Sequence, residues 1–144
     1  MKGYAGQAAT EYLALIGMIL IATIPIFYYV NEQVESNTRM NQANDAVSIL
    51  ANAADSIYAL GPGSINYAWV SIPSGVKSVS IAGTNENIIL LKLSIFGGVS
   101  DFTAQSKAKL TAKGDLLNTL SKKGIYKVSL KAEEDKVELE ISGL

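Results

Sequence analysis

An uncharged hydrophobic stretch near the start of the chain limits what this protein can fold into. No residue from Tyr12 to Val30 is charged, and a helix of that length rises roughly 28 Å at about 1.5 Å per residue. The hydrocarbon core of a bilayer has nearly the same thickness, roughly 30 Å. A single soluble domain would not leave such a surface in water. We therefore expect lipid, or other copies of the chain, to cover this stretch.

The composition argues against several classes of function. A content of 49% hydrophobic and 17% charged residues fits one modest domain joined to an apolar helix. The net charge is −1, and the lysines are spread along the second half rather than gathered into a face for nucleic acid. The chain has no cysteine and no histidine, so disulfides, thiolate metal sites and imidazole catalysis are excluded. We predict a protein that is not an enzyme and holds no cofactor or metal.

The residues before the apolar stretch look like the cytoplasmic side of a membrane signal. Lys2 carries a positive charge, and the segment ends in the small residues Ala5 and Gly6. After Val30 there is no small-x-small cleavage site, and the sequence continues in a helical rhythm. Any cleavage is therefore expected before the apolar stretch.

The run Gly6-Gln7-Ala8-Ala9-Thr10-Glu11-Tyr12-Leu13 resembles the class III signal peptide of archaeal type IV pilin-like proteins. In that family a prepilin-type peptidase cleaves ahead of a Gln, and a Glu is the fifth residue of the mature chain. The resemblance, which covers roughly residues 3 to 30, implies cleavage between Gly6 and Gln7. It also implies that the new N-terminal amine of a neighbouring subunit meets the Glu11 carboxylate during assembly.

The role of Glu11 has two further interpretations. An N-terminal Gln7 can cyclise to pyroglutamate, which would remove the amine and leave only hydrogen bonds to Glu11. Alternatively, Glu11 simply flanks the span in the headgroup layer. A carboxylate costs about 2.5 to 3.5 kcal/mol at the centre of a bilayer and less near its surface.

Two residues inside the apolar stretch affect how it packs. Pro25 removes one helical hydrogen bond, which predicts a kink or local melting on assembly, and Thr23 offers a hydroxyl to the freed carbonyl. A proline tolerated in a membrane helix is the alternative. Gly17 permits close approach of a neighbouring helix.

Beyond the apolar stretch, hydrophobic and small residues recur at spacings of three and four, which is typical of a helix with one buried face. No Gly or Pro interrupts residues 31–60, and Gly61-Pro62-Gly63 then ends the pattern. The predicted buried seam consists of Met40, Ala43, Val47, Leu50, Ala54 and Ile57. The polar residues expected to face outward include Asn41, Asn44, Asp45, Asn52 and Asp55.

After Gly63 the periodicity changes to two, which is typical of strands with one buried face. The clearest alternation predicts one strand over residues 102–112. Residues 126–132 and 137–141 also alternate, and the Glu133-Glu134-Asp135 segment between them predicts a hairpin with Lys and Glu on its solvent face.

Three earlier strands are predicted over residues 65–72, 76–82 and 88–95. Residues 88–91 are apolar on both faces, which indicates a central strand covered on two sides. Asp115 is a possible cap of a short helix over residues 115–121. Together these segments predict about six strands, mostly antiparallel.

Two residue groups have a possible binding role. Glu133, Glu134, Asp135, Glu138 and Glu140 form an acidic cluster with oxygen ligands for a divalent cation. We favour the alternative that these carboxylates face water, because alternate residues of a strand point to the same side. The aromatic group of Tyr58, Tyr67 and Trp69 is expected in the core or at a subunit interface rather than on a ligand-binding surface.

We therefore predict an α+β fold with a pilin-like lollipop arrangement. Its parts are a leader peptide over 1–6, a helix over 7–60 with a membrane span or filament core over 12–30, and a β domain over 61–144 packed on the lower helix. The expected function is that of a structural subunit, inserted in the membrane as a precursor and then polymerised into a surface filament. Its expected partners are the membrane, the peptidase, the pilus assembly machinery and other copies of itself. The alternative is a minor pilin, or an uncleaved single-span protein that displays an extracellular binding domain.

Overall fold

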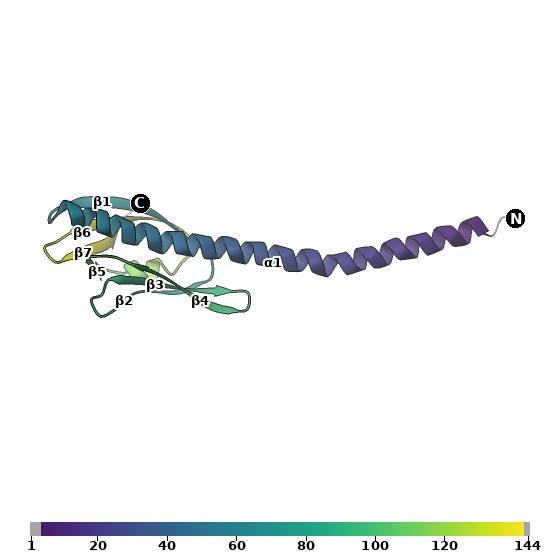
Figure 1. Cartoon of the computed structure of the whole chain (residues 1–144). Helices are drawn as coiled ribbons and strands as arrows, with labels where there is room; N and C mark the ends of the chain where they lie inside the picture. The colour runs from purple at the N-terminus through teal and green to yellow at the C-terminus, as the bar shows by residue number, and fades with distance from the viewer. Residues whose placement is uncertain (1–3, 143–144) are drawn as a thin grey trace. The chain divides into compact units, whose positions relative to one another are not determined.

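A computed structural model of the chain describes the backbone of residues 4–142 and the side chains of residues 9–142. It has the predicted α+β fold, in which a long N-terminal helix, α1 (Tyr4–Leu60), precedes a β region (Figure 1). The chain divides into an N-terminal unit, Met1–Glu35, and a C-terminal unit, Ser36–Leu144. The elements after α1 are β1 (Ile65–Ile72), β2 (Val76–Ala82), β3 (Ile88–Ile95), β4 (Gly98–Gln105), β5 (Lys109–Ala112), α2 (Leu116–Thr119), β6 (Gly124–Ala132) and β7 (Lys136–Ile141).

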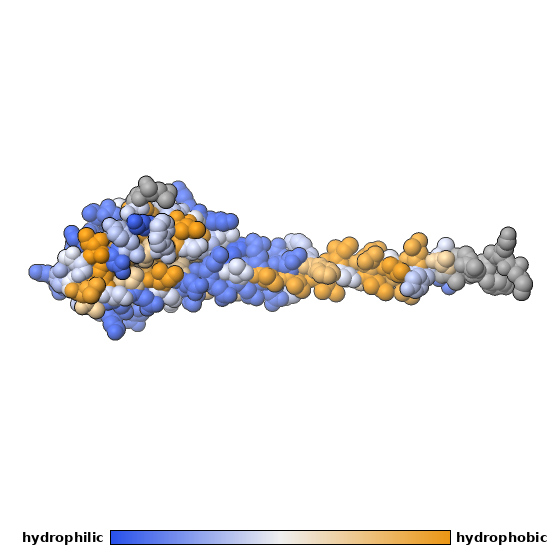
Figure 2. Space-filling view, turned by 90° about the horizontal axis from the view of Figure 1, so that it is seen from above, coloured by the Kyte–Doolittle hydropathy of each residue, from blue (hydrophilic) through white to orange (hydrophobic). Residues whose placement is uncertain are grey.

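The part of α1 in the N-terminal unit has hydrophobic side chains on all sides. Successive helical residues are rotated by about 100°, so the four consecutive residues 18–21 point in four directions around the axis. All four are large, hydrophobic and exposed. Figure 2 shows the corresponding band of hydrophobic surface. A helix of this kind lacks the polar face that a surface helix of a soluble protein has.

The part of α1 in the C-terminal unit is amphipathic, as its sequence predicts. Five members of the seam are buried, and Met40 packs against them from a half-buried position. Two further alanines, Ala46 and Ala51, are also buried and widen the buried face beyond the predicted seam. Small side chains on this face let the strands pack close to the helix.

Two sheets complete the core of the C-terminal unit. One has the order β1-β6-β7-β5 and the other the order β2-β3-β4. All neighbouring strands are antiparallel except β5 and β7, which are parallel. Buried side chains from both sheets and from α1 belong to one hydrophobic cluster. Burial of a large aliphatic side chain contributes about 1.5–3 kcal/mol, so this cluster is the main stabilising feature of the unit.

The bounds of β1, β2 and β3 match the predicted strands, and the predicted hairpin is present as β6 and β7. β3 is the central strand of its sheet, as expected. The expectation that it is covered on both faces is wrong, because Ile89, Leu91 and Leu93 are buried while the residues between them are only partly buried.

The single strand predicted over residues 102–112 is wrong. It is divided into β4, which pairs with β3, and β5, which pairs with β7. The alternation of buried residues continues across the division, since Ser106, Ala108 and Leu110 are all buried. The chain thus passes from one sheet to the other without changing which side chains face the core.

Asp55 of α1 holds this crossing in place, so the expectation that Asp55 faces outward is also wrong. Its Oδ1 accepts hydrogen bonds from the Ser106 hydroxyl at 2.7 Å and from the Lys107 N–H at 2.7 Å. Ser106 Oγ in turn accepts a hydrogen bond from the Ala108 N–H at 3.1 Å. These bonds satisfy polar groups that leave the strand ladder at the crossing.

The short helix α2 lies within the range predicted for it. Asp115 precedes α2, but its side chain makes no capping hydrogen bond to the backbone. Its Oδ1 instead accepts a hydrogen bond from Asn118 Nδ2 at 2.6 Å. The predicted capping role of Asp115 is therefore wrong.

Candidate functional site

All the residues predicted for processing and assembly lie on α1. Gly6 and Gln7 fall within the helix, and their side chains lie outside the described part of the chain. The predicted cleavage between them stays a prediction. Glu11 and Tyr12 follow on the same helix, and both are exposed.

The hydrophobic part of α1 is long and apolar enough to cross a membrane. An 18-residue window has a mean hydropathy of 2.3, and 0% of it is buried within the structure. A core helix of a soluble protein has similar composition but is mostly buried. The chain therefore carries one N-terminal helix that fits a membrane anchor by its length, composition and exposure.

Gly17 lies in the middle of this hydrophobic part. Apart from its chain neighbours and the adjacent helix backbone, no atom lies within 4 Å of the position that a Cβ would take there. The surface around Gly17 is thus open to an approaching helix. The close packing predicted at this residue involves a second chain and stays a prediction.

Pro25 lies inside α1, which continues through it as helix. A proline at this position cannot donate to the carbonyl of Ile21. The Thr23 hydroxyl donates instead to the carbonyl of Ile19, at 2.6 Å, so the expected contribution of Thr23 to the carbonyl freed by Pro25 is wrong. A kink or melting of the helix on assembly stays a prediction.

The aromatic group on the C-terminal unit is exposed rather than buried. Tyr58 is 39% exposed, Tyr67 51% and Trp69 59%. Tyr67 and Trp69 lie on the same side of β1, and Lys127 Nζ of the neighbouring strand lies 4.3 Å from the centre of the Tyr67 ring. The prediction of a core position is therefore wrong, and a subunit interface stays a prediction.

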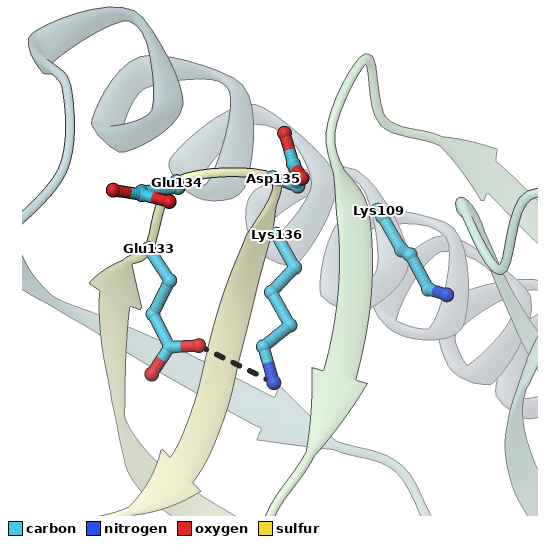
Figure 3. Close-up of a pocket in the computed structure, with 5 residues that line it drawn as sticks. All are labelled: Lys109, Glu133, Glu134, Asp135 and Lys136. Carbon is cyan, nitrogen blue, oxygen red and sulfur yellow. Dashed lines mark ion pairs between the residues drawn. The ribbon is translucent and has the colours of Figure 1, made fainter.

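The acidic cluster borders a surface recess at the β6–β7 turn (Figure 3). The recess is lined by Lys109, Glu133, Glu134, Asp135 and Lys136. Glu133 Oε2 lies 3.2 Å from Lys136 Nζ, and Figure 3 shows Glu134 and Asp135 directed away from this pair.

The other two carboxylates of the cluster lie near Lys113. Its Nζ is 3.9 Å from Glu138 Oε2 and 3.7 Å from Glu140 Oε2. Across residues 4–142 no three His, Cys, Asp or Glu side chains are arranged to hold a metal ion. Lysines, rather than a cation, compensate much of the negative charge here.

The turn between β3 and β4 is a surface feature that sequence reasoning interpreted only as a turn. Phe96 is 65% exposed and Val99 58% exposed. The Phe96 N–H donates a hydrogen bond to Ser36 Oγ at 3.3 Å, which holds the turn against α1. The signal in the sequence was the placement of two large hydrophobic residues on either side of Gly97-Gly98.

These features define a class of protein, an α+β chain whose single apolar helix can anchor it in a membrane. Comparison of the chain with models of known protein families, with curated proteins and with solved structures finds no match.

Proposed function

We propose that this protein is the structural subunit of an archaeal type IV pilus-like surface filament. The observation that carries the proposal is the apolar part of α1, which is exposed on every side and directly follows the Gly6-Gln7 junction and Glu11. A membrane span alone explains the apolar surface. The junction and the carboxylate support a second state, in which other copies of the chain cover the same surface.

The physical basis of the proposed assembly is an exchange of partners. Lipid tails are as apolar as the side chains of residues 12–30, so helices leaving the bilayer gain little from the hydrophobic effect. Close packing at Gly17 and pairing at Glu11 must therefore supply the preference for the filament. The contact joins different surfaces of successive subunits, so it does not close into a ring and continues as a helix of subunits.

The processing step is tested by mass spectrometry of the mature protein from its native host. The expected N-terminal residue is Gln7 or its pyroglutamate form. A mature chain that starts at Met1 would contradict the cleavage and favour the uncleaved single-span protein.

The assembly step is tested by substitution of Glu11. Glu11→Ala is expected to leave membrane insertion intact and to reduce the number of filaments seen by electron microscopy, because the incoming N-terminal amine loses its partner. Glu11→Gln keeps the hydrogen-bonding capacity without the charge. It is expected to retain filaments if Gln7 is pyroglutamate and to lose them if the free amine is present.

The matched control is Glu35→Ala, which removes an exposed carboxylate from the same helix beyond the apolar stretch. It is expected to assemble normally. If Glu11→Ala forms as many filaments as the unsubstituted protein, Glu11 has only a flanking role at the membrane surface.

A further inference from the structure

We infer that the tip of the β3–β4 hairpin, Phe96 and Val99, inserts into the surface of the lipid bilayer while the chain is anchored by α1. The inference rests on the membrane-anchored stage of the proposed function. It adds a second lipid contact, made by the C-terminal unit.

The hairpin tip has a composition that the turn itself does not require. Ile95 pairs with Gly98, so Phe96 and Gly97 form the turn. Tight turns favour Gly, Pro, Asn, Asp and Ser, and Gly97 supplies the positive φ, 97°. Phe96 and Val99 nevertheless place large apolar side chains in the solvent-exposed tip. An aromatic residue in such a position is typical of contact with a membrane interface.

Two hydrogen bonds fix the direction of β4 along α1. The first joins the Phe96 N–H to Ser36 Oγ, and the second joins the Ser106 hydroxyl to Asp55. Ser36 and Asp55 are separated by roughly 28 Å of helix, and Phe96 and Ser106 by roughly 33 Å of extended chain. These lengths agree, so β4 runs beside α1 (Figure 1) and the turn lies at the Ser36 end.

The chain between Val30 and Ser36 sets the distance from the apolar stretch to this turn. Residues 31–35 are helical and rise roughly 8 Å. The headgroup layer on one side of a bilayer is about 5–8 Å thick. A membrane span that ends at Val30 therefore leaves Ser36, and with it the turn, at the outer edge of the headgroups. Apolar side chains at that level reach the boundary between headgroups and acyl chains.

Lipid is the occupant that these observations favour over a second copy of the chain. The tip is near the end of the apolar stretch along the helix, so an apolar phase is already present at its level in the precursor. The adjacent spacer contains Glu32 and Glu35, which disfavours attraction to anionic lipid. We therefore choose zwitterionic lipid for the test.

The experiment places a tryptophan at the tip. Trp69 is the only tryptophan of the chain and is exposed, so Trp69→Phe provides a dark background. Full-length chain carrying Trp69→Phe and Phe96→Trp is reconstituted, at low protein-to-lipid ratio, into phosphatidylcholine vesicles. Some vesicles contain lipid brominated near the glycerol end of the acyl chains. The expected result is a blue-shifted emission in plain vesicles and a loss of emission in the brominated ones.

The matched control is Tyr58→Trp in the same background. Tyr58 is an exposed aromatic residue at the other end of the same helical segment, roughly 33 Å from Ser36. It is expected to show neither the blue shift nor the loss. Equal emission of the Phe96→Trp chain in both kinds of vesicle would overturn the inference. A blue shift that appears only as the protein-to-lipid ratio rises would also overturn it and would identify a second copy as the occupant.

Extraction of the same vesicles with alkaline carbonate separates this inference from the proposed function. Chain that is released by carbonate has no membrane-spanning helix, and the anchored stage itself is then contradicted. Chain that is retained while the tryptophan at position 96 is not quenched contradicts only the insertion of the tip.

Discussion

Replacement of Asp55 is the sharpest test of how the C-terminal unit is held together. In Asp55→Ala, the Ser106 hydroxyl and the Lys107 N–H both lose their acceptor. A hydrogen bond to a charged group contributes about 1.5–3 kcal/mol. Lys107 is exposed, so water replaces its lost bond, whereas Ser106 is only 1% exposed and its hydroxyl stays without an acceptor.

The expected net loss of unfolding free energy follows from two opposing contributions. The loss at Ser106 and the weaker loss at Lys107 sum to about 2–3 kcal/mol. Alanine is a better helix former than aspartate by up to about 0.7 kcal/mol, which offsets part of this. We expect a net destabilisation of about 2 kcal/mol, which lowers the urea midpoint by roughly 1 M at a slope of about 1–3 kcal/mol per molar.

The assay is urea unfolding of the full chain in detergent micelles, followed by Trp69 emission, which reports on β1 in the C-terminal unit. Asp45→Ala is the matched control, because Asp45 is an exposed aspartate on the same helix. It should change the unfolding free energy by less than about 0.5 kcal/mol. If Asp55→Ala also stays within that range, the hydrogen bonds of Asp55 do not hold the crossing between the sheets.

Two further predictions concern the stability of the same unit and use the same urea assay. Gly75→Ala places a Cβ 3.1 Å from the Ser94 carbonyl oxygen at a φ of 90° and should cost more than Gly97→Ala, which has a φ of 97° and open space; equal costs would show that the contact with Ser94 yields freely. Leu110→Ala opens a cavity in the core and should cost about 2–5 kcal/mol, whereas Leu60→Ala removes a side chain that is 74% exposed and should cost little; similar values for the two would contradict the assigned core.

The sequence predicted those parts of the fold that depend on local pattern. The bounds of β1, β2 and β3 follow from alternation between turn residues, and the buried seam of α1 follows from its spacing of three and four. Pairing partners were beyond reach, because alternation over residues 102–112 shows which side chains are buried and not which strand lies alongside. The division at Ser106 therefore appeared only in the structure.

The candidate site was predictable in its helix and unpredictable in its surfaces. Charge-free length alone identified the hydrophobic part of α1. Asp55 looked like any solvated aspartate on a helix, since its partners lie far away in the chain at Ser106 and Lys107. Phe96 was overlooked for the opposite reason, because a hydrophobic residue next to two glycines gives no sign of whether it points into the core or out of a turn.

The pairing of β1 with β6 determines when the C-terminal unit completes its folding. β2, β3 and β4 pair with their neighbours in the chain and are available to one another early in synthesis. β1 has to wait, because its residues pair with Gly124–Lys131 of β6, and such non-local pairing is slow. While the chain crosses a membrane, Tyr67 and Trp69 would therefore stay on an unpaired strand until nearly the last residues emerge, which is the period when the nascent chain is most exposed to aggregation.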